Sequence, residues 1–165
     1  MKNLVLMAGL LFVNIAFSQS TAFSKENTSA QDITFNDGLY FKQDLAYTGK
    51  YIVYYSNGSV KEELNIKDGK LNGDVIKYFE SGTKKEVSHF ENNLKFGLWA
   101  RYNSNGTLAV EASYKNDKKD GTWIVYSENG AKLFKMEYKD GEKVGTWTQW
   151  DEKGEVANTT TYSNL

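Results

Sequence analysis

The sequence contains no cysteine and no proline among its 165 residues, and it has a single histidine. Without cysteine the chain can form no disulfide, no thiolate zinc site and no cysteine nucleophile. The absence of proline is compatible with long strand ladders, because a proline nitrogen cannot donate a hydrogen bond to a neighbouring strand. Arg101 is the single arginine, so the bidentate guanidinium contacts that favour phosphate recognition are nearly absent.

The charge is balanced and dispersed. The chain has 20 basic and 21 acidic residues and a formal net charge of −1. Nucleic-acid binding calls for clustered basic residues, so no nucleic-acid partner is expected. A membrane surface is disfavoured as well, because it would require a more basic face. With 40% hydrophobic and 15% aromatic residues, the chain has enough apolar surface for one folded domain.

The first 18 residues have the composition of a secretory signal. Lys2 precedes an apolar run from Leu4 to Phe17, and small residues such as Ser18 follow. The run is shorter than the roughly 20 apolar residues that span a bilayer, and no cysteine is present for a lipid anchor. We predict a cleaved signal peptide over 1–18, cleavage after Ser18, and a secreted or periplasmic mature protein.

A polar segment follows the predicted signal. Residues 19–32 contain one aromatic residue, Phe23, which is too little apolar surface to offset the entropy of ordering. This segment is predicted to be a flexible leader. The remaining residues, 33–165, are predicted to form the folded domain.

Two series of glycines recur every 24 residues in that domain. The first series is Gly49, Gly73, Gly97, Gly121 and Gly145, and the second is Gly58, Gly82, Gly106, Gly130 and Gly154. The residues two positions after the first glycine are Tyr51, Val75, Trp99, Trp123 and Trp147. The residues five positions after it are Tyr54, Tyr78, Tyr102, Tyr126 and Trp150. The fixed period predicts five structural repeats, which start at residues 49, 73, 97, 121 and 145.

Each repeat is predicted to be a β-hairpin. Stretches such as "YIVYYS" are rich in aromatic and β-branched residues, which favour strands. Asn-Gly at the second glycine of three repeats supplies the positive φ of a tight hairpin. In the returning segment Phe134, Met136 and Tyr138 alternate with polar residues, as in a strand with one core face. Links of 5–7 residues such as "KDGKLNG" then lead to the next repeat.

The predicted fold class is therefore all-β, an elongated antiparallel meander of about ten strands. A segment around residues 39–47 would extend it to eleven or twelve strands. One repeat advances the sheet by roughly 9.6 Å, because neighbouring strands lie about 4.8 Å apart. Glu62 and Glu86 replace apolar residues of the same column, Val110 and Phe134, and are interpreted either as protection of exposed sheet edges or as ordinary surface residues.

The segment "YKNDKKDGTWIVYSENGAKLFKMEYKDGEKVGTWTQWDEKGE" and the opening "DLAYTGKYIVYYSNGSVKEELNIKDGKLNG" resemble the MORN repeat variant family, which includes the bacterial YwqK-type "antitoxin" repeat proteins. The resemblance covers residues 38–165 and implies a MORN-like single-layer sheet that serves as an interaction surface for proteins or lipids. The stretch "GTWIVYSENG" is also similar to the shorter repeats that anchor choline-binding proteins to cell walls. An antitoxin against a cytoplasmic toxin should not carry an export signal.

Aromatic residues are the candidate ligand-binding residues, since a row of rings can stack on sugars or bind cations through π faces. Core packing explains the same rings. The candidates are Trp99, Trp123, Trp147, Tyr102 and Tyr126.

No enzymatic site is expected, because an open meander offers a surface and not a pocket. His89 falls on an outward column without a nucleophile at a motif-like spacing, and the acidic turns lack the pattern of a calcium loop. No cofactor, metal or catalytic residue is therefore predicted.

Three hypotheses follow for the function. The first is an exported non-enzymatic protein that mediates protein or glycan interactions at the cell envelope. The alternative is an antitoxin-like partner that neutralises a toxin, and the third is an envelope enzyme. The sequence leaves open whether the chain is a monomer or an edge-paired oligomer.

Overall fold

The computed structural model describes residues 33–163, and all regular structure within them is β-strand. The predicted signal peptide over 1–18 and the leader over 19–32 lie outside the described residues. Within 33–163 there is no helix of the length and hydropathy that crossing a membrane requires.

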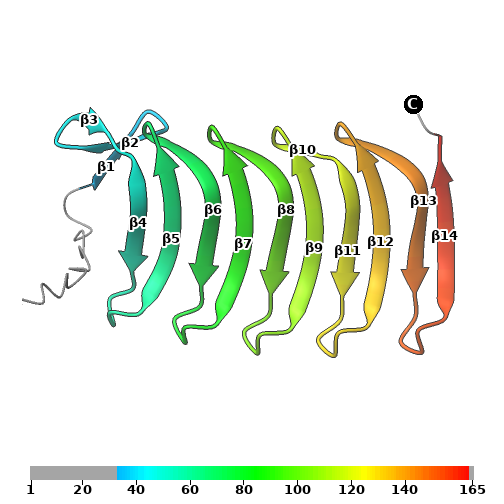
Figure 1. The fold of residues 1–165 in the computed structure, drawn as a ribbon. Helices are drawn as coiled ribbons and strands as arrows, with labels where there is room; N and C mark the ends of the chain where they lie inside the picture. Colours follow the sequence, from blue (N-terminus) through cyan, green and yellow to red (C-terminus); the bar gives the residue numbers. More distant parts are fainter. Residues whose placement is uncertain (1–32, 164–165) are drawn as a thin grey trace, which may run out of the picture.

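The described chain forms a small sheet and a large one (Figure 1). The strands of the small sheet are β1 (Ile33–Asn36), β2 (Leu39–Lys42) and β3 (Leu45–Ala46). The strands of the large sheet are β4 (Gly49–Tyr54), β5 (Val60–Lys67), β6 (Lys70–Tyr78), β7 (Lys84–Glu91), β8 (Leu94–Tyr102), β9 (Leu108–Lys115), β10 (Lys118–Lys119), β11 (Gly121–Tyr126), β12 (Lys132–Lys139), β13 (Glu142–Trp150) and β14 (Val156–Tyr162). Its strands pair antiparallel in chain order from β4 to β14, and β10 pairs with β9 alone. Figure 1 shows one elongated layer, which confirms the predicted meander.

The chain turns back at the second-series glycines, as predicted, but the tightest turns lie at the other ends of the strands. Two-residue turns connect β5 to β6, β7 to β8, β9 to β10 and β12 to β13. In all four, both turn residues have positive φ, as in Asp68 (50°) with Gly69 (77°) and Asn92 (51°) with Asn93 (71°). Positive φ at both positions defines a type I′ turn, which matches the twist of the flanking strands. Segments such as "KDGKLNG", predicted to be links, are therefore hairpin turns followed directly by strand.

The Asn-Gly positions form a wider turn. The φ angle of Gly58 is positive (84°), whereas that of Asn57 is not. The Gly58 nitrogen donates to the Tyr55 carbonyl (3.0 Å), the Tyr55 nitrogen donates to the Ser59 carbonyl (2.8 Å), and the register shifts beside the turn. This is the three-residue turn with a glycine bulge, so glycine alone supplies the positive φ.

The large sheet has two different faces, because side chains alternate along each strand. Trp99 lies opposite Ala112, which is 1% exposed, and Trp123 lies opposite Met136. We call the face with these residues the tryptophan face. The other face carries His89, which lies opposite Asp74, and we call it the histidine face.

The best-buried apolar cluster lies on the tryptophan face near the start of the sheet. Leu64, Ile66 and Val75 are 3–4% exposed there. Tyr40 and Tyr47, from β2 and the residue after β3, pack against this cluster. Backbone hydrogen bonds fix them in place: the Tyr40 nitrogen donates to the Gly69 carbonyl (2.8 Å), and the Gly69 nitrogen donates to the Tyr47 carbonyl (2.8 Å).

The segment around residues 39–47 therefore does not extend the meander as predicted. It belongs to a separate three-stranded sheet, β1 to β3, which we call the cap. Figure 1 shows the cap at one end of the large sheet, beside β4 and β5. Its tyrosines help to remove these aliphatic side chains from water.

Glu62 and Glu86 do not protect an edge. Both lie on interior strands of the tryptophan face, where the strand register runs from Glu62 through Lys77 and Glu86 to Arg101. The Lys77 Nζ atom lies 3.8 Å from the Glu86 Oε1 atom. Opposite charges placed directly across strands stabilise a sheet, so these residues form a cross-strand ionic row.

Candidate functional site

The first-series glycines create the site on the tryptophan face. Strand register places Gly97, Gly121 and Gly145 opposite aromatic residues of the next strand, and these residues are Tyr114, Tyr138 and Tyr162. Each glycine has positive φ, as in Gly121 (102°), and lies in a strand with no side chain of its own. The opposing ring therefore lies beside the tryptophan two residues further along the glycine strand.

The rings join into one continuous row across the last three repeats. Consecutive ring centroids are separated by 6.4, 5.3, 5.6, 5.2 and 4.8 Å, in the order Trp99, Tyr114, Trp123, Tyr138, Trp147 and Tyr162. These distances and the tilted or edge geometries are those of favourable aromatic pairs. We call this row the aromatic ladder.

A lysine ammonium group lies over each tryptophan-tyrosine pair of the ladder. The Lys119 Nζ atom is 4.2 Å from the Trp123 centroid and 4.6 Å from the Tyr138 centroid. Lys143 lies 4.7 Å from Trp147, and Lys95 lies 5.0 Å from Tyr114. These distances are within the range of cation–π attraction, so the ring faces already contact cations of the same chain.

The indole nitrogens show that the tryptophans also stabilise the fold. Trp123 Nε1 donates to the Ser113 carbonyl (3.1 Å), and Trp147 Nε1 donates to the Glu137 carbonyl (3.0 Å). Trp99 Nε1 is buried and has no hydrogen-bond partner among the described residues. Core packing, the second explanation for these rings, thus describes part of their role.

The same kinds of polar group recur along the ladder. Among residues 33–163, the ammonium groups of Lys95, Lys119 and Lys143 take part in none of the ion pairs. Each of the last three repeats thus presents a cation, a phenol and an indole in the same arrangement.

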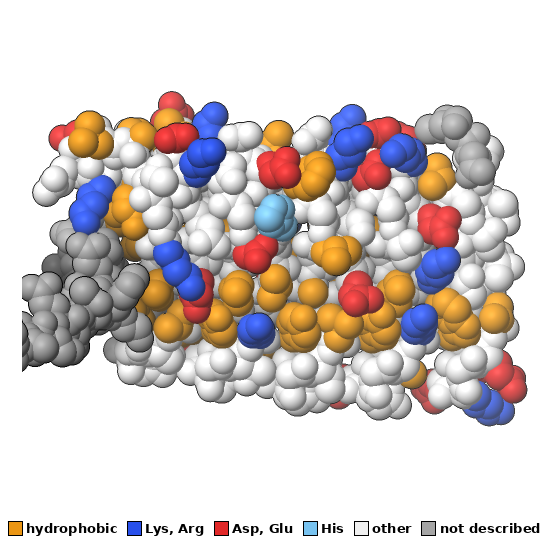
Figure 2. Space-filling model, viewed as in Figure 1, with side chains coloured by type: hydrophobic (Ala, Val, Ile, Leu, Met, Phe, Trp, Pro, Cys, Tyr) orange, Lys and Arg blue, Asp and Glu red, His pale blue; other side chains and the backbone are white. Residues whose placement is uncertain are grey.

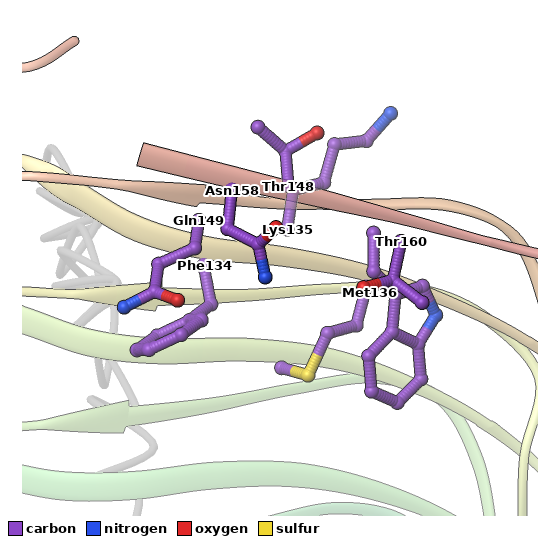
Figure 3. A pocket seen from close by; sticks show the side chains of 8 residues that line it. Phe134, Lys135, Met136, Thr148, Gln149, Asn158 and Thr160 are labelled. Atoms are coloured by element: carbon purple, nitrogen blue, oxygen red, sulfur yellow. The ribbon is translucent and has the colours of Figure 1, made fainter. Parts of the chain in front are cut away.

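The ladder ends beside a shallow hollow of about 110 Å³ between β12, β13 and β14. Figure 3 shows Phe134, Met136, Gln149 and Thr160 around it, with Lys135 and Thr148 directed to the other side of the sheet. The hollow has both apolar and amide lining groups, which suits a small part of a larger ligand.

The structure separates the five predicted ligand-binding residues. Trp99, Trp123 and Trp147 share the tryptophan face, whereas Tyr126 donates its hydroxyl to the Glu111 carboxylate on the histidine face (2.7 Å). This hydrogen bond raises the pKa of Tyr126 to about 12. Tyr102 lies at the equivalent place one repeat earlier, so no single ligand on one face contacts all five residues.

The histidine face has an apolar band of its own. Figure 2 shows hydrophobic side chains gathered along the length of the sheet, interrupted by single lysines and acids. Strand register places five aromatic residues at the hairpin ends of this face: Tyr54, Tyr78, Tyr102, Tyr126 and Trp150.

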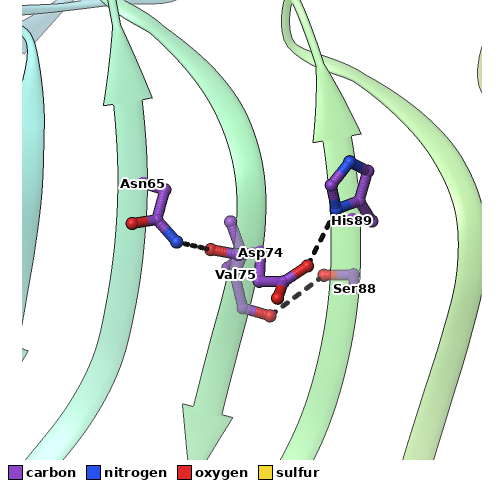
Figure 4. Close-up of polar contacts among 5 residues, drawn as sticks. All are labelled: Asn65, Asp74, Val75, Ser88 and His89. Atoms are coloured by element: carbon purple, nitrogen blue, oxygen red, sulfur yellow. Dashed lines mark hydrogen bonds and ion pairs between the residues drawn. The ribbon is translucent and has the colours of Figure 1, made fainter.

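The polar residues around His89 do not form a catalytic triad (Figure 4). His89 Nδ1 lies 2.8 Å from the Asp74 carboxylate on the histidine face. Ser88 is the preceding residue of the strand, is 1% exposed on the tryptophan face, and donates to the Val75 carbonyl at 3.4 Å. A hydroxyl on the opposite face cannot transfer its proton to the imidazole. In residues 33–163 no group of three or more candidate metal ligands is found.

The lysine row was missed at the sequence level, although its signal is present. The residues four positions before the tryptophan column are Tyr47, Leu71, Lys95, Lys119 and Lys143. This column changes from apolar residues to lysine at the third repeat, and the tryptophan column first holds tryptophan at the same repeat. Joint inspection of the two columns would have identified the site.

Comparison with known proteins agrees with this architecture. The model of the MORN repeat variant family matches residues 47–68, 71–92, 97–116, 119–140 and 143–164. A search of curated proteins finds no match to the chain. The five family matches cover more than half of the sequence and follow the hairpins of the large sheet, so the chain belongs to the MORN repeat variant family.

Proposed function

We propose that this chain is an exported, non-enzymatic repeat protein that binds a protein or glycan at the cell envelope through the tryptophan face. Membership of the MORN repeat variant family indicates a repeat protein that binds other molecules. The observation that carries the proposal is the aromatic ladder with its three lysines, over which no second layer of described strands lies from β8 to β14 (Figure 1). An unpartnered row of rings and cations is a binding surface.

Export is tested by fractionating native cells and reading the N-terminus of the protein in each fraction by mass spectrometry. A mature chain that begins at Gln19 outside the cytoplasm is the expected result, because residues 1–18 have the composition of a signal. An intact chain from Met1 in the cytoplasm would overturn the envelope location. That result would favour the toxin-neutralising role of the YwqK-type proteins and direct the search to a toxin partner.

The binding face is tested with single cysteines, because the native chain has none. Gln149→Cys lies on the tryptophan face, and Thr159→Cys lies on the histidine face of the adjacent strand. Both native side chains are exposed, so the substitutions should leave the fold unchanged. Each cysteine is coupled to a bulky polyethylene glycol maleimide.

Co-sedimentation with envelope material of native cells is then measured for the two labelled proteins. The label at position 149 should abolish binding by steric exclusion, and the label at position 159 should leave it intact. Equal binding by both labelled proteins contradicts the assignment of the face, and no binding by the unlabelled protein contradicts the proposed function.

A further inference from the structure

The charges of the tryptophan face change along the sheet. In the first repeats Glu62 and Glu86 lie opposite basic residues, so charges cancel across the strands. From β8 to β14 the strand positions on this face contain no aspartate or glutamate. They contain four basic residues, Lys95, Arg101, Lys119 and Lys143, and Arg101 lies opposite Glu86 of β7. None of Lys95, Lys119 and Lys143 forms an ion pair among residues 33–163, although Asp117 accepts a hydrogen bond from the Lys95 backbone nitrogen (2.7 Å).

These charges form a regular line. The three lysines are 24 residues apart, and each lies on the same position of its hairpin, so the sheet separates neighbouring ones by two strands or roughly 9.6 Å. That spacing is close to the length of one disaccharide unit in an extended polysaccharide. A linear acidic polysaccharide that directs one carboxylate per disaccharide to the same side, as an extended chain of sugar acids does, would therefore place these carboxylates opposite successive lysines.

Each position also offers groups that recognise sugar rings. The Lys119 ammonium lies over the rings of both Trp123 and Tyr138, which holds it next to an indole and a phenol. Burial and the carboxylates of Glu86 and Asp117 raise the pKa of Tyr114, so its hydroxyl remains protonated and available as a hydrogen-bond donor. A sugar acid matches these groups: its carboxylate suits the ammonium, its hydroxyls suit the phenol, and its apolar face suits the aromatic ring.

We propose that the ladder of the last three repeats binds a linear, carboxylate-bearing polysaccharide that runs across the strands, with one carboxylate against each of Lys95, Lys119 and Lys143. This inference rests on the proposed function and names the chemical class of its ligand. Single exposed ion pairs contribute little, so affinity comes from simultaneous contacts along one polymer.

The test measures the affinity of the purified mature protein for oligogalacturonates by isothermal titration calorimetry. The dimer, the tetramer and the hexamer are compared, and the methyl-esterified hexamer is the control of equal length without charge. Affinity should rise from dimer to hexamer, fall on esterification, and weaken with added salt because exposed charges are screened.

Two triple variants with the same net charge distinguish the effect of the lysine row on affinity from the effect of total charge. Lys95→Gln with Lys119→Gln and Lys143→Gln should lower hexamer affinity by about tenfold or more, because three contacts are lost together. The control is Lys67→Gln with Lys115→Gln and Lys132→Gln, which removes the same charge from exposed positions of the histidine face and should bind normally. Circular dichroism checks that both variants keep their strand content. Arginine at the three ladder positions should retain binding.

Equal affinity for charged and esterified hexamer, absence of length dependence, or equal losses in both triple variants would each overturn the carboxylate assignment. Tighter binding to vesicles that contain anionic lipid than to the hexamer would assign the row to a lipid surface instead. If envelope material still binds the lysine variant, the proposed function stands and the charge assignment fails. If envelope material binds neither variant nor native chain, the proposed function itself fails.

Discussion

The first two repeats and the last three share one backbone plan but stabilise the tryptophan face differently. In the first two, the column that holds tryptophan elsewhere holds Tyr51 and Val75, and the cap covers an aliphatic cluster. In the last three, Trp99, Trp123 and Trp147 join an aromatic ladder under lysines, and no second layer covers them (Figure 1).

The difference shows two ways in which a single layer removes apolar surface from water. A cap excludes water from small side chains such as Leu64, which is 4% exposed. Large rings cover the backbone themselves, and the lysine ammonium groups lie over these rings. The second solution keeps the face accessible, so the part of the molecule that can bind a partner is the part without a cap.

The largest expected effect comes from the capped cluster. Leu64→Ala should lower the free energy of unfolding by about 2–5 kcal/mol, because it leaves a cavity among Ile66, Val75 and the cap. Met136 is the residue of the same column in the fourth repeat and is only half-buried, so Met136→Ala should cost roughly half as much. Urea denaturation followed by circular dichroism measures both, and equal losses would contradict the distinction between the two regions.

A smaller effect distinguishes the tryptophans within the ladder. Trp123→Phe and Trp147→Phe each remove an indole hydrogen bond to a backbone carbonyl. Trp99→Phe removes an indole nitrogen that has no partner among the described residues. The first two substitutions should therefore cost about 1 kcal/mol more than the third. The same denaturation experiment tests this order, and an equal cost at position 99 would show that its nitrogen is satisfied in solution.

The smallest expected effect is a change of folding stability with pH. It arises on the histidine face, where both regions have a tyrosine-glutamate pair. The hydrogen bond to Glu111 raises the pKa of Tyr126 to about 12 from 10.0. The folded state therefore holds this proton more tightly than the unfolded state, so the stabilisation is complete below about pH 10 and is lost as pH rises toward about 12.

Titration of phenolate absorbance measures this effect. Tyr126→Phe should remove the phenol that ionises near pH 12 and reduce the loss of stability between pH 10 and 12. Tyr78→Phe is the matched control, because Tyr78 donates to Glu63 in the first region (3.0 Å), and burial together with that hydrogen bond raises the pKa of Tyr78. A native titration without a high-pH phenol would contradict the pairing.

The repeat architecture could be predicted because its signals are local. Glycine phasing, the alternation around Phe134 and Met136, and the aromatic columns define hairpins without knowledge of distant contacts. The Asn-Gly turns were predicted at the correct ends of the strands but as the tighter class of turn, because Asn-Gly suits both a two-residue turn and a glycine bulge. Pairs such as Asn92 with Asn93 form type I′ turns without glycine, since asparagine tolerates the left-handed region.

The cap and the site could be predicted only in part. Tyr40 and Tyr47 contact residues that lie well beyond them in the chain, and no local pattern specifies that packing. Trp99, Trp123 and Trp147 were identified from their column. Tyr102 and Tyr126 were grouped with them. Each follows a tryptophan of its strand by three residues, and side chains separated by an odd number of positions along a strand lie on opposite faces.

The strand order has a consequence for how the protein folds. Every strand of the large sheet pairs with a strand next to it in the chain or separated from it by the short β10, so no pairing requires closure of a long loop. All-β proteins usually fold slowly because their contacts join distant residues. Here a hairpin formed anywhere can act as the template for the next, so folding can advance one hairpin at a time while the rest of the chain is still extended.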